Sequence, residues 1–149
     1  MDFVKDQSAG YLANHMARLF AKGLTARIKP LGLTTGTFPA LLELWDGDGL
    51  TQKQLVERLD IEQATMANTL ARMERDGLIR REKDENDGRV QRVWLTDHSS
   101  ELRNPAIEAA IAENAEALAA LTDEERRQFI ALMQKVISAR KYQTKLVSA

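Results

Sequence analysis

Between residues 50 and 96, apolar side chains recur with a spacing that changes from helical to extended. The helical part opens at Thr51, which stands three residues before Gln54 in the arrangement of a capping box. Leu55 and Leu59 give the short helix that follows one apolar side. We expect this helix to end near Asp60, where the apolar spacing breaks.

A second helical pattern begins directly afterwards. Met66, Leu70 and Met73 recur at i, i+4 and i+7 and therefore share one face, whereas the other faces are polar. Gly77 follows the pattern and suits the left-handed position beyond a helix C-terminus. Two short helices joined by a tight bend, the second polar on its outer side, predict a helix-turn-helix.

Extended patterns follow the second helix. Segments 78–83 and 90–95 have the composition of strands, and residues 84–88 between them form a polar turn sequence. Val93 and Leu95 alternate with polar or amphipathic neighbours, as a hairpin with one face on a core requires. A helix-turn-helix followed by a hairpin is a winged helix, and this unit is most often used to bind duplex DNA.

Two helices are predicted before this unit. Residues 11–28 carry an apolar stripe with helical spacing, which Pro30 ends. Thr34 or Thr35 is the expected cap of the next helix. That helix must start late or bend, because Pro39 is tolerated only near a first turn.

Amphipathic sequence also follows the hairpin. Asn104 and Pro105 have the signature of a fresh helix start. Thr122 and Glu125 form another capping box, and the apolar pattern behind it fades at Arg140, so we expect a loose tail from there. No linker interrupts the chain, and residues 1–149 are expected to form one domain.

Several segments, in this order and at this spacing, resemble the MarR family of bacterial transcription regulators. They are residues 61–66, 72–79 and 93–96, with 31–34 upstream and 121–125 downstream. The resemblance therefore covers nearly the whole chain. It departs from the family pattern in the wing, where members commonly carry Asp-Arg-Arg and this chain has Asp87-Gly88-Arg89.

The resemblance implies a mainly α fold with a small β-hairpin wing. A winged helix-turn-helix at 51–96 would be flanked by dimerisation helices at 8–30 and 105–140. The family has one long helix directly after the wing, so the resemblance implies that the helix continues through Pro105 with a kink there. The terminal helices of two protomers would intertwine into a homodimer, which places two recognition helices about one DNA turn apart on an inverted repeat. The alternative is that these helices pack only on their own domain.

Composition excludes some functions. The chain has 149 residues, of which 44% are hydrophobic and 29% charged, as in ordinary globular proteins. Cysteine is absent from the sequence, which excludes thiolate metal sites and cysteine-based peroxide sensing. The two histidines have no metal-like spacing, and we predict neither a metal site nor a cofactor. Without a signal peptide or an apolar run of membrane-spanning length, the expected location is cytoplasmic.

Charge is an argument against DNA binding. Positions 51–96 hold nine Lys or Arg and nine Asp or Glu, so the unit lacks the basic footprint that nucleic-acid binding usually leaves. Binding requires the charges to be segregated by face.

Polar residues around the second helix and the wing are the predicted DNA contacts. Asn68 lies opposite the apolar stripe, and asparagine pairs bidentately with adenine in the major groove. Gln63 and Thr65 are candidates for base contact, with an exposed spacer role as the alternative. The full predicted set is Lys53, Gln63, Thr65, Asn68, Thr69, Arg72, Arg75 and Arg89.

The wing has its own predicted roles. The resemblance places Arg89 in the minor groove, where narrow A·T-rich stretches concentrate negative potential. Asp87 would repel phosphate, so we predict that it pairs with Arg72 and braces the wing against the recognition helix. The alternative is a solvated Arg89 and an Asp87 that only forms the turn.

An effector site is also implied, because the family often has a pocket between its dimerisation and DNA-binding parts. A small aromatic or phenolic ligand would need a cationic partner, His15 or Arg18, beside the apolar walls Phe38, Leu42 and Trp45. The alternative is an ordinary core edge with a surface arginine.

The resulting hypothesis is a dimeric, sequence-specific DNA-binding regulator, a repressor whose DNA affinity falls when an effector binds. An enzyme is the first rival, but the sequence has no glycine-rich phosphate loop and no nucleophile elbow. A winged helix that binds protein in place of DNA is the second, and the neutral charge count allows it.

Overall fold

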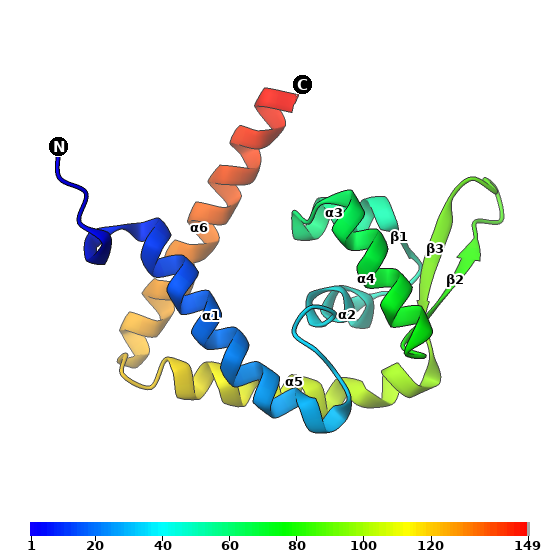
Figure 1. Ribbon diagram of the computed structural model, residues 1–149, viewed down its shortest axis with the longest axis horizontal. Helices are drawn as coiled ribbons and strands as arrows, with labels where there is room; N and C mark the ends of the chain where they lie inside the picture. The colour runs from blue at the N-terminus through cyan, green and yellow to red at the C-terminus, as the bar shows by residue number, and fades with distance from the viewer. Residues whose placement is uncertain (149) are drawn as a thin grey trace. The chain divides into compact units, whose positions relative to one another are not determined.

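The computed structural model describes residues 1–148 (Figure 1). These residues group into two compact units, Met1–Glu113 and a second unit that begins at Asn114. In chain order the elements are α1 (Ala9–Ile28), α2 (Phe38–Asp46), β1 (Leu50–Thr51), α3 (Gln52–Leu59), α4 (Gln63–Arg75), β2 (Ile79–Lys83), β3 (Gln91–Leu95), α5 (Asp97–Ala117) and α6 (Asp123–Ser148). Short 3₁₀ turns lie at Lys5–Gln7 and Lys29–Leu31. In the described part of the chain no helix has the length and hydropathy of a bilayer span.

The predicted helix-turn-helix is confirmed as α3 and α4. Both halves of the capping box are present: the Gln54 N–H donates to Thr51 Oγ1 at 3.1 Å, and the Thr51 N–H donates to Gln54 Oε1 at 2.8 Å. Asp60 adopts a left-handed conformation with φ 54° and ends α3, so that α4 starts three residues later. Gly77, with φ 74°, follows α4 in the conformation that the sequence predicted.

The wing is an antiparallel sheet with the strand order β1-β3-β2. Val93, in the middle of β3, lies opposite Leu50 on one side and Arg81 on the other, and it is 1% exposed. The sequence did not predict β1, because two residues are too short to show alternation. Gly49 before it has φ 81° and lies beneath Trp94, where a Cβ would come within 2.8 Å of the indole ring. Glycine is therefore required at the entrance to this sheet.

The start of α2 differs from the prediction. Its N-cap is Thr37, not Thr34 or Thr35, and Pro39 therefore falls within the first turn. The Thr37 N–H and hydroxyl both donate to the Thr34 carbonyl, which makes residues 34–37 a turn and delays the helix. Proline needs this late start because it lacks the N–H of a helix interior.

A buried serine joins α5 to the winged helix. Ser99 is fully buried, and its hydroxyl donates to the Leu78 carbonyl at 2.6 Å. Its own carbonyl accepts a hydrogen bond from the Trp45 indole N–H at 3.0 Å. Thr96 caps α5 by accepting the Ser99 N–H at 3.2 Å, and its hydroxyl donates to the Gly77 carbonyl at 2.7 Å. The end of α4, the wing and α5 are therefore connected by satisfied polar groups.

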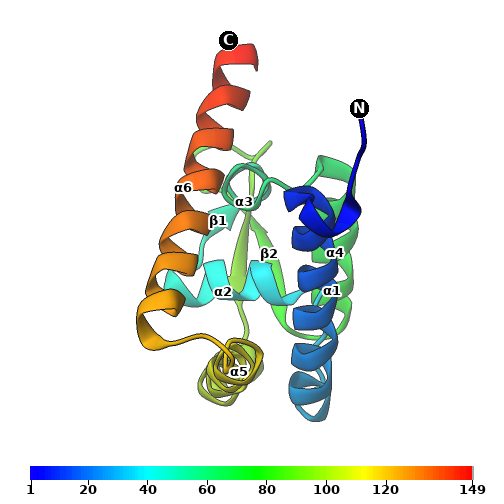
Figure 2. The ribbon, with the colours of Figure 1, turned by 90° about the vertical axis from the view of Figure 1, so that its left-hand side faces the viewer.

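Helices α1 and α5 both contribute residues to the apolar core of the first unit. Ile28, at the end of α1, and Ala106 on α5 are both fully buried in the same apolar cluster. Figures 1 and 2 show the C-terminal end of α1 beside α5 from two directions. α5 passes through Pro105 without interruption, so the fresh start at Asn104 is wrong and the continuous helix is confirmed.

In the second unit, the capping box at the start of α6 is confirmed. The Glu125 N–H donates to Thr122 Oγ1 at 3.1 Å, and Glu125 Oε1 accepts the Thr122 N–H at 2.9 Å. The loose tail predicted after Arg140 is wrong, because α6 continues to Ser148. Lysine, glutamine and leucine in this stretch are good helix formers, and helix propensity does not require the apolar pattern that fades here.

Candidate nucleic-acid interface

The outer face of α4 is the first part of the candidate interface. Met66, Leu70 and Met73 are each 1% exposed or less, which turns the opposite side of the helix to solvent. The residues exposed there include Gln63, Thr65, Asn68, Arg72 and Arg75, all of them predicted contacts. Their side chains are therefore available to base edges and phosphates.

Thr69 does not belong to this exposed set. It is 6% exposed, and its hydroxyl accepts a hydrogen bond from Arg72 Nη2 at 3.4 Å. Thr69 stands three residues after Met66 and next to Leu70, so it lies on the flank of the buried stripe. Thr69 is therefore a predicted contact that the fold buries, and its hydroxyl holds the Arg72 side chain.

A groove between the start of α3 and the wing is the second part. It has a volume of about 490 Å³ and is lined by Thr51, Gln52, Lys53, Arg89, Val90 and Gln91. The fold thus brings Lys53 and Arg89, both predicted contacts, to one groove although they are far apart in sequence. A cationic groove of this kind suits a nucleic-acid backbone.

Four groove residues, Thr51, Gln52, Val90 and Gln91, were not among the predicted contacts. Gln52 and Gln91 line the groove, and the Gln52 amide donates to Gln63 Oε1 at 3.0 Å, which links the start of α3 to the start of α4. Both flank predicted residues in the sequence, Gln52 next to Lys53 and Gln91 two positions after Arg89. Only the pairing of the wing with β1 brings them together.

Ion pairs neutralise part of the charge of the winged-helix unit. Three of its carboxylates are held by sheet arginines, in the pairs Glu74–Arg81 at 2.9 Å, Glu82–Arg80 at 2.8 Å and Asp84–Arg92. The Arg81 guanidinium lowers the pKa of Glu74, which keeps that carboxylate charged. On the interface side, Lys53 and Arg72 are exposed and have no carboxylate partner among residues 1–148. Two of the predicted contacts, Lys53 and Arg72, therefore keep a charge that no ion pair of the described residues neutralises.

The predicted brace between Asp87 and Arg72 is wrong. The Asp87 carboxylate accepts the backbone N–H of Arg89 at 3.0 Å and its guanidinium at 3.1 Å. The Arg89 hydrogen bonds lower the pKa of Asp87. Arg72 instead bonds Thr69, one turn back on its own helix. A residue two positions away is a nearer partner for Asp87 than one on another element, because the turn itself places Arg89 there.

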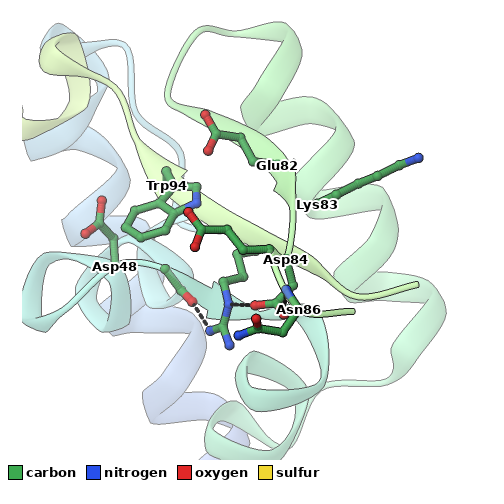
Figure 3. Close-up of a pocket in the computed structure, with 9 residues that line it drawn as sticks. Asp48, Glu82, Lys83, Asp84, Asn86 and Trp94 are labelled. Carbon is green, nitrogen blue, oxygen red and sulfur yellow. Dashed lines mark hydrogen bonds and ion pairs between the residues drawn. The ribbon is translucent and has the colours of Figure 1, made fainter. Parts of the chain in front are cut away.

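Another arginine holds the wing. The Arg92 guanidinium bonds the Asp84 carboxylate through Nε and donates to the Gly49 carbonyl at 2.7 Å through Nη1, as the dashed lines in Figure 3 show. Asp84 Oδ2 also accepts the backbone N–H groups of Asn86 and Asp87, each at 3.0 Å. Because Gly49 directly precedes the β1 strand that leads into α3, Arg92 ties the wing turn to the start of the helix-turn-helix.

The predicted effector residues differ in their burial. Phe38 is buried in the core and meets Trp45 edge-on, with 6.1 Å between ring centroids. The Trp45 N–H is taken by the Ser99 carbonyl. His15 and Arg18 are exposed on α1, and Leu42 is 36% exposed on α2. The sequence analysis therefore assigned exposed residues of α1 to the same site as Phe38 and Trp45, which pack in the core.

Comparison with known proteins gives consistent matches. Residues 31–90 match the profile of the MarR family. The transcriptional regulator HosA of Escherichia coli O111:H- is 36% identical over 107 residues, which cover 72% of this chain and 79% of HosA. The HTH-type transcriptional repressor Rv2887 of Mycobacterium tuberculosis H37Rv is 27% identical over 91% of this chain and 98% of its own length.

Solved structures show the same fold. A MarR transcriptional regulator from Methanosarcina mazei Go1 aligns with a TM-score of 0.81 and 25% identity over 87% of this chain and 94% of that one. A MarR-family regulator from Listeria monocytogenes, solved with a 26-mer of DNA, aligns with a TM-score of 0.81 and 23% identity over 99% of this chain and 95% of that one.

Replacing Asp84 with asparagine tests the Arg92 brace. The amide of the new side chain would keep an oxygen for the turn N–H groups but lose the charge that Arg92 binds. The Arg92 hydrogen bond, followed by the bond from the Asn86 N–H, lowers the pKa of Asp84 below its ordinary value of 3.8. The ionised group therefore stabilises the folded chain above that value, and the contribution is lost as pH falls through the lowered pKa.

In urea unfolding, Asp84→Asn should therefore be less stable than the parent at about pH 7, and the difference should shrink at about pH 3. Glu85→Gln is the matched control, because Glu85 is exposed and has no hydrogen bond or ion pair with the described residues. An equal loss at both pH values would show that the charge is not what Arg92 recognises.

Proposed function

The chain belongs to the MarR family of DNA-binding transcription regulators, and from that premise we propose that it binds an inverted-repeat operator as a homodimer and represses transcription there. The observation that carries this proposal is that the groove of Lys53 and Arg89 is joined to the exposed face of α4 by the hydrogen bond from Gln52 to Gln63. The 13 residues of α4 extend over roughly 20 Å, which suits a major groove, with the wing beside the neighbouring minor groove.

Exposed apolar side chains support the homodimer. On α6, Leu132, Val136 and Ile137 are 56–67% exposed, and on α1 the side chains of Leu12 and Leu19 are 47% and 58% exposed. Apolar surface that one chain leaves to water on both terminal helices is typical of an interface. A two-fold dimer would present two α4 helices to two half-sites. The repressor role is supported by the name of the Mycobacterium tuberculosis relative.

We also propose that the protein responds to an effector, and that the effector site is completed only in the dimer. Phe38 and Trp45 are committed to the core, so a single chain offers a small aromatic or phenolic ligand only an open surface at His15 and Arg18. A second copy that covers α1 would supply the opposite wall, and the cationic side chains would then face an enclosed space. An anionic ring is the ligand that such a site would favour.

Base readout by Asn68 tests the proposal. In a full set of single-base operator variants, Asn68→Ala should lose about 1–3 kcal/mol of discrimination at one base pair in each half-site, because the bidentate contact to adenine is removed. Non-specific binding should stay the same. Asn104→Ala is the control, since Asn104 is exposed on α5 and belongs neither to α4 nor to the groove lining. If the parent protein shows no base preference at all, a protein-binding winged helix replaces this proposal.

The charged residues at the wing tip give a second test, in which two substitutions should change DNA affinity in opposite directions. Arg89→Ala should weaken binding and reduce the slope of log affinity against log salt by about one, because one phosphate or groove contact is lost. Asp87→Asn should tighten binding, since it keeps an acceptor for the Arg89 N–H but frees the guanidinium from its carboxylate. Fluorescence anisotropy over a salt series measures both. Weaker binding by Asp87→Asn would assign that carboxylate a bracing role after all.

A further inference from the structure

A carboxylate is buried where α1 meets α5. Glu113 on α5 is 9% exposed, and its Oε2 accepts a hydrogen bond from Arg27 Nε at 3.1 Å. Figures 1 and 2 show the two helices meeting near the C-terminal end of α1. A buried carboxylate is unfavourable unless it is paired, so the position of Glu113 depends on its reach to Arg27.

Gly23 makes room for that carboxylate. It lies four residues before Arg27 and so on the same side of α1. A Cβ added at Gly23 would be 2.1 Å from Glu113 Oε1 and 2.4 Å from both Cδ and Oε2. The carboxyl group therefore rests directly on the backbone of α1. Glycine is unfavourable inside a helix, and this close approach is what it provides here.

The contact constrains the helix pair at two points. Nearer the core, Ile28 packs in the same cluster as Ala106, and Ala109 and Ala110 on α5 are packed against it. One turn beyond these alanines, Glu113 meets Gly23 and Arg27. Rotation of α1 about the apolar contact would pull the ion pair apart, and closer approach would drive the carboxyl into the backbone. The apolar cluster and the ion pair therefore both restrain α1 relative to α5.

The angle between these two helices bears on DNA binding if the proposed dimer is correct. α5 starts directly after β3 and is therefore joined to the wing, whereas α1 carries the exposed Leu12 and Leu19 that are assigned to the dimer. We propose that Gly23, Arg27 and Glu113 are positioning residues that set the angle between α1 and α5, and thereby the spacing of the two operator half-sites that the dimer accepts. The inference rests on the proposed function, because it needs two chains on one DNA.

The test uses the full chain and a series of DNA duplexes. Each duplex carries two half-sites whose separation changes by single base pairs, and one further duplex carries a single half-site. The variants are Gly23→Ala, Glu113→Gln and the double change Gly23→Ala with Glu113→Ala, which removes the carboxyl that the new methyl would meet. Gly10→Ala is the matched control on the same helix, because a Cβ there has nothing within 4 Å.

The parent and Gly10→Ala should prefer the same separation. Gly23→Ala and Glu113→Gln should shift that optimum or reduce its preference over neighbouring separations by roughly fivefold, with affinity for the single half-site unchanged. A protein that was only less stable would lose both affinities together. The double variant should melt at a higher temperature than Gly23→Ala and retain a broadened spacing preference, because the clash is removed but the ion pair is not restored.

Each outcome decides the inference. If the parent prefers one separation and Gly23→Ala and Glu113→Gln keep that profile, the positioning role is wrong and the proposed function stands. If the parent binds no duplex in the series, the proposed function is wrong and the spacing role falls with it. Should Gly23→Ala fail to fold, Glu113→Gln decides alone, because the amide keeps the shape of the carboxyl and removes its charge.

Discussion

Burial of one face of α4 is the constraint on which the interface depends. Met66, Leu70 and Met73 are almost completely removed from solvent, and each such side chain contributes about 1.5–3 kcal/mol of burial free energy. Rotating α4 by one residue would expose this stripe, so its orientation about its own axis is strongly determined. Asn68 and Gln63 face outward for this reason. Thr69 borders the stripe and is buried with it.

The wing is held by polar contacts of two kinds. Asp84 is mostly buried, with 15% of its side chain exposed, and it accepts bonds from Arg92 and from two backbone N–H groups. This arrangement positions the turn relative to α3. The Arg89–Asp87 pair at the tip is different, because 92% of the arginine side chain is exposed and such pairs contribute little to stability. Arg89 can therefore exchange Asp87 for a phosphate or a base edge without loosening the wing.

Local signals made most of the fold predictable. Helical spacing located α4, and two capping boxes gave the starts of α3 and α6 because both partners lie within one turn. Alternation gave the hairpin. Contacts between distant segments carried no such signal: Arg27 and Glu113 are 86 positions apart, and Arg92 finds Gly49 only after β1 pairs with β3. The surroundings of the effector residues were also not predictable, since periodicity shows which side of a helix is apolar but not which residues become core.

Selection of duplex DNA from a random pool by the full chain tests the central claim that α4 and the wing form a DNA-reading surface. We predict enrichment of a sequence with two inverted half-sites whose centres lie about one helical turn, roughly 10 base pairs, apart. Binding to that sequence should weaken steeply between about 50 mM and 200 mM salt, because phosphate contacts release counterions. A selected pool that remains indistinguishable from the input, or binding that does not respond to salt, would contradict the account.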